Sequence, residues 1–599
     1  MSPNERAGTR RGAGAVVGGL AGLVSGALTG GLLAGQDVMV GAAFAARGAN
    51  TGFALYLLVS VALGAGFGLV VRYERGAYAA DVSGGLILGL VRFVLGPLTL
   101  VPLVAGDSVR WSITTTIAAF PQLVAAMGYG ALMGFVFHVG MSWWRTVRPL
   151  SDIVRAPAPT RRIVVLGGGF GGVGVVQRLE RIFARSPHVD VTIVSASNYL
   201  LFTPMLAEVA SSALRAEHIS TPIRASCPRT RFRRAEVDAV DTERGHVRIR
   251  QDDGSTELLE YDHLVLALGS VPTFRGLPGL AEHAFALKSL DDATRVRNHV
   301  LALLERADGE ADPVTRCTLL TFVVAGGGFA GTEMIAELFD LVHSVLHYFP
   351  GVTADDARFV LVHSGERILP ELDADLGEYA RERLAARGIE FVFGSRLAGA
   401  TSTAVQLADG DEIPTYTLIW TAGNQPNPVL DQLPFARSRA GAVIAEPTLR
   451  IAGYENVWGV GDCAAVPDPA HDGAFYPPTA QHALRQGKTV ADNIERSMRG
   501  RTPNPFRFRT LGILVALGHR TAVAEIRGHR FSGFAAWLMW RAIYLAKLPG
   551  IERKLRVSAD WLMDFMFPRN IVVTSTTPTL PETLAAAPPD ADAGVVLAP

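Results

Sequence analysis

Two glycine-rich loops of the same design constrain the fold of this chain more than any other feature. Each loop follows a short apolar run, at residues 163–166 and 322–325, and each has G-x-G-x-x-G spacing before a helical pattern. In such a loop the first glycine permits a tight turn, the second lets the backbone approach a pyrophosphate, and the third lets a helix pack on a strand. The glycines are Gly167, Gly169 and Gly172 in the first loop and Gly326, Gly328 and Gly331 in the second.

Two such units in one chain predict two bound dinucleotides, because each helix N-terminus offers free N–H groups to phosphates. This layout is typical of proteins that pass electrons from a nicotinamide to a flavin. From residue 162 the pattern is that of a doubly wound α/β sheet, with strands predicted at 261–268 and 457–460. Because the second glycine unit, at 315–425, lies between these strands, we expect one Rossmann-like domain inserted in another. The outer domain then comprises 162–314 and 426–500.

The composition argues against several kinds of partner and redox centre. Arginine plus lysine and aspartate plus glutamate each number 56, so no net charge favours nucleic acid as a partner. The three cysteines, Cys227, Cys317 and Cys463, form no C-x-x-C pair. This spacing argues against a redox-active disulfide, a zinc ribbon and a thiolate-held iron–sulfur cluster, and we predict no metal site.

The N-terminal quarter has the composition of a membrane protein. Apolar runs at 14–35, 52–71, 84–105 and 118–140 are each about long enough to cross a bilayer as a helix. Arginines are dense before the first run, between the second and third, and after the fourth. The positive-inside rule then predicts a transmembrane module at 1–145 in the cell membrane, with everything after it, starting with a linker at 146–161, in the cytoplasm.

Two features of this module each allow two interpretations. Glycines recur at every fourth position from Gly14 to Gly30, which makes a ridge for close helix contact. The ridge serves either packing within the module or formation of a homodimer. Arg92 lies inside the third run; it is either a functional intramembrane charge or a side chain that extends to the nearer interface.

The body resembles the two-dinucleotide-binding flavoproteins, and among them the type II NADH:quinone dehydrogenases. Four stretches carry the resemblance: 198–206, the Gly-Thr-Glu at 331–333, the Gly-Asp at 461–462, and the helix at 477–487. The resemblance implies FAD as cofactor, NAD(P)H as substrate, and electron transfer to a quinone without proton pumping. The implied FAD-binding residues are Gly167, Gly169, Phe170, Gly171, Gly172, Ser195, Thr203, Pro204, Gly461 and Asp462. Implied catalytic residues are Glu333, Gln481 and Arg485.

The chain departs from the family pattern at three positions. An acid that commonly holds a ribose is replaced by Ser195 in the first unit, and in the second it is displaced to Glu366. His363, Ser364 and Arg367 can instead accept a 2′-phosphate, so the choice between NADH and NADPH stays open. Arg485 stands where the family commonly has glutamine. It either contacts the quinone or pairs with an acid such as Asp492 or Glu495.

The C-terminal region, 501–574, combines aromatic residues on two helical stretches with a basic cluster. This combination predicts helices in the interface of a lipid membrane, and a soluble dimer face is the alternative. The aromatic residues are Trp537, Trp540, Tyr544, Trp561, Phe565 and Phe567, and the basic ones are Arg553, Lys554 and Arg556. Residues 575–599 are predicted to be a disordered tail.

Three other functions are compatible with parts of the pattern. A sulfide:quinone-type reductase requires paired cysteines beside the flavin, which this sequence does not have. A reductase of a soluble carrier protein leaves the membrane features without a role. The third function is that of a membrane sensor or transporter gated by the flavin domain. It would explain the extra N-terminal runs, and it remains an alternative.

Overall fold

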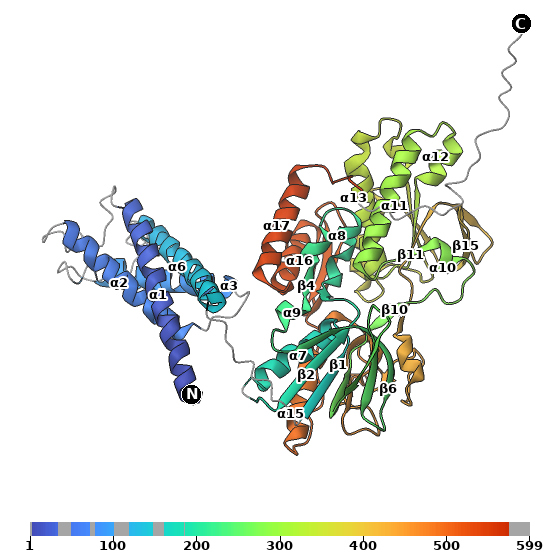
Figure 1. The fold of residues 1–599 in the computed structure, drawn as a ribbon. Helices are drawn as coiled ribbons and strands as arrows, with labels where there is room; N and C mark the ends of the chain where they lie inside the picture. The colour runs from blue at the N-terminus through green and yellow to red at the C-terminus, as the bar shows by residue number, and fades with distance from the viewer. Residues whose placement is uncertain are drawn as a thin grey trace, which may run out of the picture. The chain divides into compact units, whose positions relative to one another are not determined.

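The computed structural model describes residues 3–33, 49–71, 78–100, 103, 119–147 and 161–573, except 185 and 472. The chain divides into two compact units (Figure 1). The first unit comprises 1–153 with 550–552, and the second comprises 154–549 with 553–599. The predicted linker (but for its ends) and the predicted tail lie outside the described residues.

The first unit is helical. Its helices are α1 (Pro3–Leu33), α2 (Ala49–Val70), α3 (Tyr78–Leu95), which continues into a π-helical turn (Gly96–Leu100), and α6 (Phe120–Val147). Among the described residues, three apolar segments are long enough to cross a membrane: Gly12–Gly30, Asp81–Thr99 and Phe120–Trp144. The apolar part of α2, Tyr56–Val70, is shorter. The ends of the first and third expected runs, 34–35 and most of 101–105, lie outside the described residues.

The glycine ridge of α1 packs inside this unit. A Cβ atom built on each of three of its glycines would overlap a carbonyl oxygen of α2, so only glycine permits this approach. The contacting pairs are Gly14–Gly68, Gly18–Gly64 and Gly22–Ser60. Of the two interpretations of the ridge, the structure therefore favours internal packing, and a homodimer stays a prediction.

The second unit is built on two parallel five-stranded sheets. The first has the order β21-β9-β1-β2-β5. Its strands are β1 (Arg161–Leu166), β2 (Val189–Ser195), β5 (Arg231–Arg234), β9 (His263–Leu266) and β21 (Val457–Gly459). Residues 163–166 are fully buried because helices cover the sheet, with α7 (Phe170–Ile182) packed against β1 and β2 and α15 (Ala480–Met498) packed against α7.

The second sheet has the order β11-β18-β12-β13-β14. Its strands are β11 (Ala284–Ala286), β12 (Thr321–Ala325), β13 (Arg358–His363), β14 (Ile389–Phe393) and β18 (Thr417–Trp420). All of them lie between β9 and β21 in the sequence, so one nucleotide-binding fold is inserted in the other. Edge strand β11 precedes the predicted boundary at residue 315, and a two-stranded ladder of β10 (Ser270–Pro272) and β19 (Asn424–Pro426) pairs the two connecting segments.

Smaller elements complete the unit. The antiparallel strands are β3 (Tyr199–Leu201), β4 (Ser220–Pro222), β6 (Glu236–Asp241), β7 (His246–Arg250), β8 (Thr256–Glu260), β15 (Leu397–Ala400), β16 (Ala404–Leu407) and β17 (Glu412–Pro414). Two further strands, β20 (Val443–Ile444) and β22 (Ala464–Ala465), pair in parallel. The remaining α-helices before residue 500 are α8 (Leu206–Ala210), α9 (Ile223–Ser226), α10 (Leu280–His283), α11 (Leu290–Asp308), α12 (Pro313–Leu319), α13 (Phe329–Val345) and α14 (Ala374–Ala385).

The C-terminal region differs from the prediction in two respects. An antiparallel sheet of β23 (Gly512–Ala516), β24 (Ala522–Ile526) and β25 (His529–Ser532) precedes helices α16 (Gly533–Lys547) and α17 (Ile551–Met566). Trp540 and Trp561, predicted at a membrane interface, are instead buried at 2% and 9% exposure. Phe565 and Phe567 are exposed, as the prediction requires.

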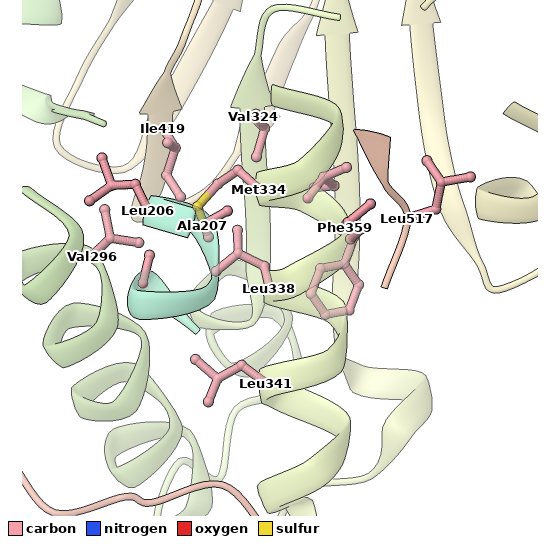
Figure 2. Close-up of a cluster of buried hydrophobic side chains, with 14 of the residues drawn as sticks. Leu206, Ala207, Val296, Val324, Met334, Leu338, Leu341, Phe359, Ile419 and Leu517 are labelled. Atoms are coloured by element: carbon pink, nitrogen blue, oxygen red, sulfur yellow. The ribbon is translucent and has the colours of Figure 1, made fainter. Parts of the chain in front are cut away.

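One core joins this region to the inserted domain. Helix α8, which follows the loop at 198–206, packs against α11 and α13. Figure 2 shows Ala207 of α8 beside Met334 and Leu338 of α13, with Leu517, the residue after β23, in the same cluster. This packing holds the first turn of α13 between the loop and the sheet.

Candidate active site

The first glycine loop contains two glycines that touch backbone and one that faces open space. A Cβ on Gly167, whose φ is 113°, would overlap the carbonyl oxygen of Ala267, and one on Gly172 would overlap that of Gly167. A Cβ on Gly169 would meet nothing within 4 Å. Gly169 is also the N-cap of α7, and no side chain caps this helix end. The loop therefore leaves room for a phosphate group beside free N–H donors.

The second loop repeats this arrangement. Gly326 has a φ of 118°, and a Cβ on Gly331 would overlap the carbonyl oxygen of Gly326. Gly328 is the N-cap of α13 without a side-chain cap. Its Cβ would meet one group within 4 Å, a carboxylate oxygen of Glu371 at 3.7 Å. Both loops thus fit a dinucleotide pyrophosphate.

Asp462 lies at the end of β21 in a small polar cluster. The turn before it is fixed, because Gly461 has a φ of 73° and its N–H donates to Gln486 Oε1 at 2.8 Å. Ser270 Oγ donates to Asp462 Oδ2 at 2.7 Å, and Lys288 Nζ donates to Ser270 Oγ at 2.8 Å. Sequence reasoning missed Ser270 and Lys288, since no motif marks them and only the fold brings them to Asp462.

The loop at 198–206 meets the first glycine helix through aromatic rings. Phe202 makes edge contacts with Phe170 at 5.9 Å and with Tyr544 of α16 at 6.1 Å between ring centroids. Thr203 and Pro204 follow Phe202 and are not buried. Ser195 is buried beneath the glycine loop, where its Oγ lies 2.5 Å from a Cβ built on Gly168. These residues therefore surround one site at the carboxyl end of β1.

Glu333 lies in the first turns of α13, near the carboxyl groups of Glu208 and Glu337. Its Oε1 accepts the N–H of Ala516, the last residue of β23, at 3.1 Å. Burial raises the pKa of Glu333 to about 8, so the carboxyl is mostly neutral at pH 7. Burial and the nearby Glu333 raise the pKa of Tyr544 above its ordinary value.

Gln481 and Arg485 lie on one face of α15. Gln481 Nε2 donates to the carbonyl of Gly512, the first residue of β23, at 3.0 Å. Glu333 and Gln481 are thus bonded to opposite ends of one strand, about 14 Å apart along it. Sequence reasoning did not find this strand, which connects the two predicted catalytic positions.

Arg485 does not pair with either of the acids considered as its surface partners. Asp492 pairs with Arg178 at 2.8 Å, and Glu495 pairs with Arg499 at 2.7 Å. The guanidinium of Arg485 instead lies 4.1 Å from the Phe508 ring centroid and donates to the carbonyl of Gln481 at 3.0 Å. Burial lowers the pKa of Lys547, and the charge of Arg485 lowers it further. A second cation, also missed in the sequence, therefore lies near Arg485.

In the loop after β13, the arginine side chain is bonded to the backbone of the same loop. Arg367 donates to the carbonyls of Pro370 at 2.9 Å and Leu372 at 3.1 Å. The N–H of Gly327 donates to His363 Nδ1 at 3.1 Å, and burial lowers the pKa of His363. Glu366 is exposed. The loop thus presents a free carboxylate while its arginine is occupied by backbone.

Comparison with known proteins connects this geometry to a family. Residues 161–487 match the model of pyridine nucleotide-disulphide oxidoreductases, and residues 511–570 match the NDH2 C-terminal domain. The type II NADH:quinone oxidoreductase Ndh of Mycobacterium tuberculosis is 31% identical over 443 residues, which cover 72% of this chain and 93% of the relative. The chain belongs to the type II NADH:quinone oxidoreductases.

Other relatives agree with this assignment. The demethylphylloquinone reductase NdbB of Synechocystis is 30% identical over 407 residues, which cover 67% of this chain and 95% of the relative. A structure of NDH2 from Plasmodium falciparum with NADH matches with a TM-score of 0.64 at 18% sequence identity. The match covers 69% of the present chain and 99% of the Plasmodium chain. At that identity the structural likeness shows the α/β dinucleotide-binding fold.

Proposed function

We propose that this protein is an enzyme that oxidises NADH through bound FAD and reduces a quinone without pumping protons. One observation carries the proposal: in a chain of this family, a Cβ built on the second glycine of each loop would meet no backbone atom within 4 Å, and each of these glycines begins a helix that no side chain caps. When bound, the flavin ring supplies the chemistry by accepting a hydride from the nicotinamide and passing electrons to the quinone. The residues of the chain bind, orient and protect the reactants.

The first loop holds the FAD pyrophosphate. Gly167 and Gly172 shape the turn, and Gly169, Phe170 and Gly171 present the backbone. Asp462, with Ser270 and Lys288 bonded in its cluster, holds the ribityl chain. Ser195, buried beneath this loop, would bond the adenosine ribose through its hydroxyl. Thr203 and Pro204 border the flavin ring.

The second loop holds NADH. Gly326, Gly328 and Gly331 bind its pyrophosphate, and the exposed Glu366 faces the ribose. A carboxylate repels a 2′-phosphate, and Arg367 is already bonded to two carbonyls, so NADH is preferred over NADPH.

The quinone side uses Gln481 and Arg485, four residues apart on one helix face. A quinone gains negative charge as it is reduced, and an amide donor or a cation stabilises that charge. Arg485 and the nearby Lys547 supply the cations. Glu333, at the other end of β23, acts on the nicotinamide side, at the start of the helix that follows the second glycine loop.

The enzyme works at a membrane. Helices α16 and α17 and the residue that follows α17 expose an apolar set of side chains of the kind that enters a bilayer interface. The set is Phe534, Leu538, Leu555, Leu562, Met563, Phe565, Met566 and Phe567. Helices α1, α2, α3 and α6 span the bilayer, and the arginine pattern places the flavin domain on the cytoplasmic side.

The test uses purified full-length protein in detergent. We expect flavin absorbance, NADH oxidation that requires an added short-chain quinone, and a lower kcat/KM with NADPH. Bound FAD without quinone-dependent NADH oxidation would instead favour a membrane sensor or transporter. A reporter active only in the cytoplasm, fused after residue 150, tests the topology. A silent reporter in a stable, inserted fusion would contradict it.

A further inference from the structure

The helical unit contains two copies of one hairpin. In the first copy Gly14, Gly18 and Gly22 of α1 meet α2, and in the second the equivalent residues of α3 meet α6. The second set of contacts is Asp81–Gly134, Gly85–Gly130 and Gly89–Ala126. Each α3 residue lies 67 positions after its α1 equivalent, and each α6 residue lies 66 positions after its α2 equivalent. The two helix pairs therefore share one register and one mode of close packing.

One turn further along this register, both copies have polar residues. Ser25 of α1 corresponds to Arg92 of α3, and Tyr56 of α2 corresponds to Gln122 of α6. We call these four residues the polar layer. All four lie within the predominantly apolar part of their helices, where a polar side chain is costly unless it has a partner.

The charge of the polar layer lies inside the bundle. The Arg92 guanidinium lies 4.7 Å from the ring centroid of Tyr56 and 4.2 Å from that of Tyr129. Tyr129 donates its hydroxyl proton to the carbonyl of Ser60 at 2.9 Å, and the hydroxyl of Tyr56 is 3.0 Å from Thr29 Oγ1. Arg92 therefore connects the two hairpins through cation–π contacts rather than extending to the interface.

Three members of the polar layer have unsatisfied atoms. In the described part of the helical unit, the buried side-chain atoms without a hydrogen-bond partner are Ser25 Oγ, Arg92 Nη1 and Gln122 Oε1. Ser25 has no exposed surface. The arginine nitrogen is only a donor, the amide oxygen is only an acceptor, and the hydroxyl is both. Ser25 and Arg92 are equivalent residues of the repeat, and Gln122 lies one turn beyond the Gly89–Ala126 contact, as Arg92 does. The three atoms therefore lie at one level of the bundle, which points to one shared ligand.

We infer that the polar layer binds the head group of a hydroquinone, the product of the proposed reaction, on which this inference rests. A hydroquinone oxygen accepts from Arg92, and its O–H donates to Gln122 Oε1. An anion offers only acceptors and leaves Gln122 Oε1 unpaired, whereas an ammonium group opposes the charge of Arg92. The aromatic ring of the hydroquinone suits a site bordered by the rings of Tyr56 and Tyr129. Its apolar tail partitions into the bilayer.

The test is photolabelling of the full-length protein in nanodiscs. The probe is a decyl-tailed benzohydroquinone with a diazirine near the ring, reduced chemically beforehand and kept under argon. We expect labelled peptides from α3 and α6 as well as from the flavin body. The double change Arg92→Leu with Gln122→Leu should reduce labelling of α3 and α6 at least tenfold, and labelling of the body should not change. Gln122→Leu alone, which keeps Arg92, should reduce it less.

The matched control is Thr99→Val, because this hydroxyl bonds a carbonyl of its own helix, Val94 O at 2.7 Å. It should leave the labelling unchanged. A labelled body with unlabelled α3 and α6 would mean that only water fills the polar layer and would overturn the inference. So would equal labelling of wild type and double variant. Labelled helices in a protein without NADH-dependent quinone reduction would overturn the proposed function and leave the polar layer as a site.

Discussion

Glycines have opposite structural roles in the two units of this molecule. In the helical unit Gly18 and Gly64 face each other, and a Cβ on either would overlap the other's carbonyl oxygen. In the flavin body a Cβ on Gly169 would meet nothing within 4 Å. The first kind of glycine lets protein touch protein, and the second keeps space for a ligand. The spacing in the sequence separates the two kinds, since G-x-x-x-G matches a helix face and G-x-G-x-x-G follows a strand.

Each nucleotide loop contains both kinds of glycine within six residues. A Cβ on Gly167 or Gly172 would overlap backbone, so these glycines fix the turn, whereas a Cβ on Gly169 would meet nothing within 4 Å. A larger side chain at Gly172 therefore damages the fold, and one at Gly169 opposes the ligand alone. This difference makes Gly169 the position where binding and folding can be separated.

The largest effect is expected from Gly169→Val. The valine side chain enters the space proposed for the FAD pyrophosphate, and its backbone conformation (φ −78°) suits an ordinary residue. FAD affinity should fall on the order of a hundredfold or more, which is at least about 2.7 kcal/mol. The measurement is the flavin-to-protein absorbance ratio together with far-UV circular dichroism. Gly309→Val, at an exposed helix end, is the control, and a fully yellow Gly169→Val protein would show that FAD lies elsewhere.

The next largest effect is expected at the proposed quinone site, on helix α15, which a close glycine contact holds in place. A Cβ on Gly487 of α15 would lie 2.5 Å from the carbonyl oxygen of Gly171, so the helix is fixed against α7. Gln481→Leu and Arg485→Ala, on the same helix, should each slow flavin reoxidation by quinone roughly tenfold to a hundredfold, because each removes a donor worth about 1–3 kcal/mol.

Stopped-flow measurement of the two half-reactions separates this role from structural damage. Flavin reduction by NADH should remain near the wild-type rate in both variants and in the double variant. Equal loss in both half-reactions would mean that the helix has moved. An unchanged reoxidation rate would place the quinone elsewhere.

In the helical unit, Gly64→Val and Gly66→Val form a matched pair. Both positions are in α2, but a Cβ on Gly64 would overlap the carbonyl oxygen of Gly18, and one on Gly66 would meet nothing within 4 Å. Gly64→Val should destabilise the α1–α2 contact by about 1–3 kcal/mol, and Gly66→Val should have little effect. Protease sensitivity of the 1–153 segment of the full chain in nanodiscs measures the difference. Equal sensitivity of the two variants would contradict the packing role of the ridge.

The sequence was most informative where structure depends on local chemistry. The glycine loops, the inserted topology and the face shared by Gln481 and Arg485 follow from turn and helix spacing within a few residues. Family membership was also recognisable from the motifs, and the comparisons confirm it.

Features that depend on distant contacts were missed or misread. Strand β23 joins Gln481 to Glu333, yet its residues carry no motif. Trp540 and Trp561 have the composition of an interface but pack 6.3 Å apart in the core. Asp492 and Glu495, the acids of the alternative interpretation of Arg485, pair with Arg178 and Arg499 instead, because helical spacing alone does not tell which of several neighbours lies closest.

The smallest expected effect sharpens the comparison between the two nucleotide loops. They differ at the second glycine: a Cβ built on Gly169 would meet nothing within 4 Å, whereas one built on Gly328 would lie 3.7 Å from a carboxylate oxygen of Glu371. A carboxylate there repels a pyrophosphate, but Glu371 is exposed and solvent screens it, so we expect Glu371→Gln to lower the KM for NADH only about twofold to fivefold. kcat should stay constant, and the improvement should shrink as ionic strength rises, because screening weakens the repulsion in the wild type. Glu366→Gln is the matched control; it should instead raise kcat/KM for NADPH, since its carboxylate is proposed to face the ribose. A KM for NADH that rises in Glu371→Gln would mean that this carboxylate binds the nucleotide through a hydroxyl rather than opposing its phosphates.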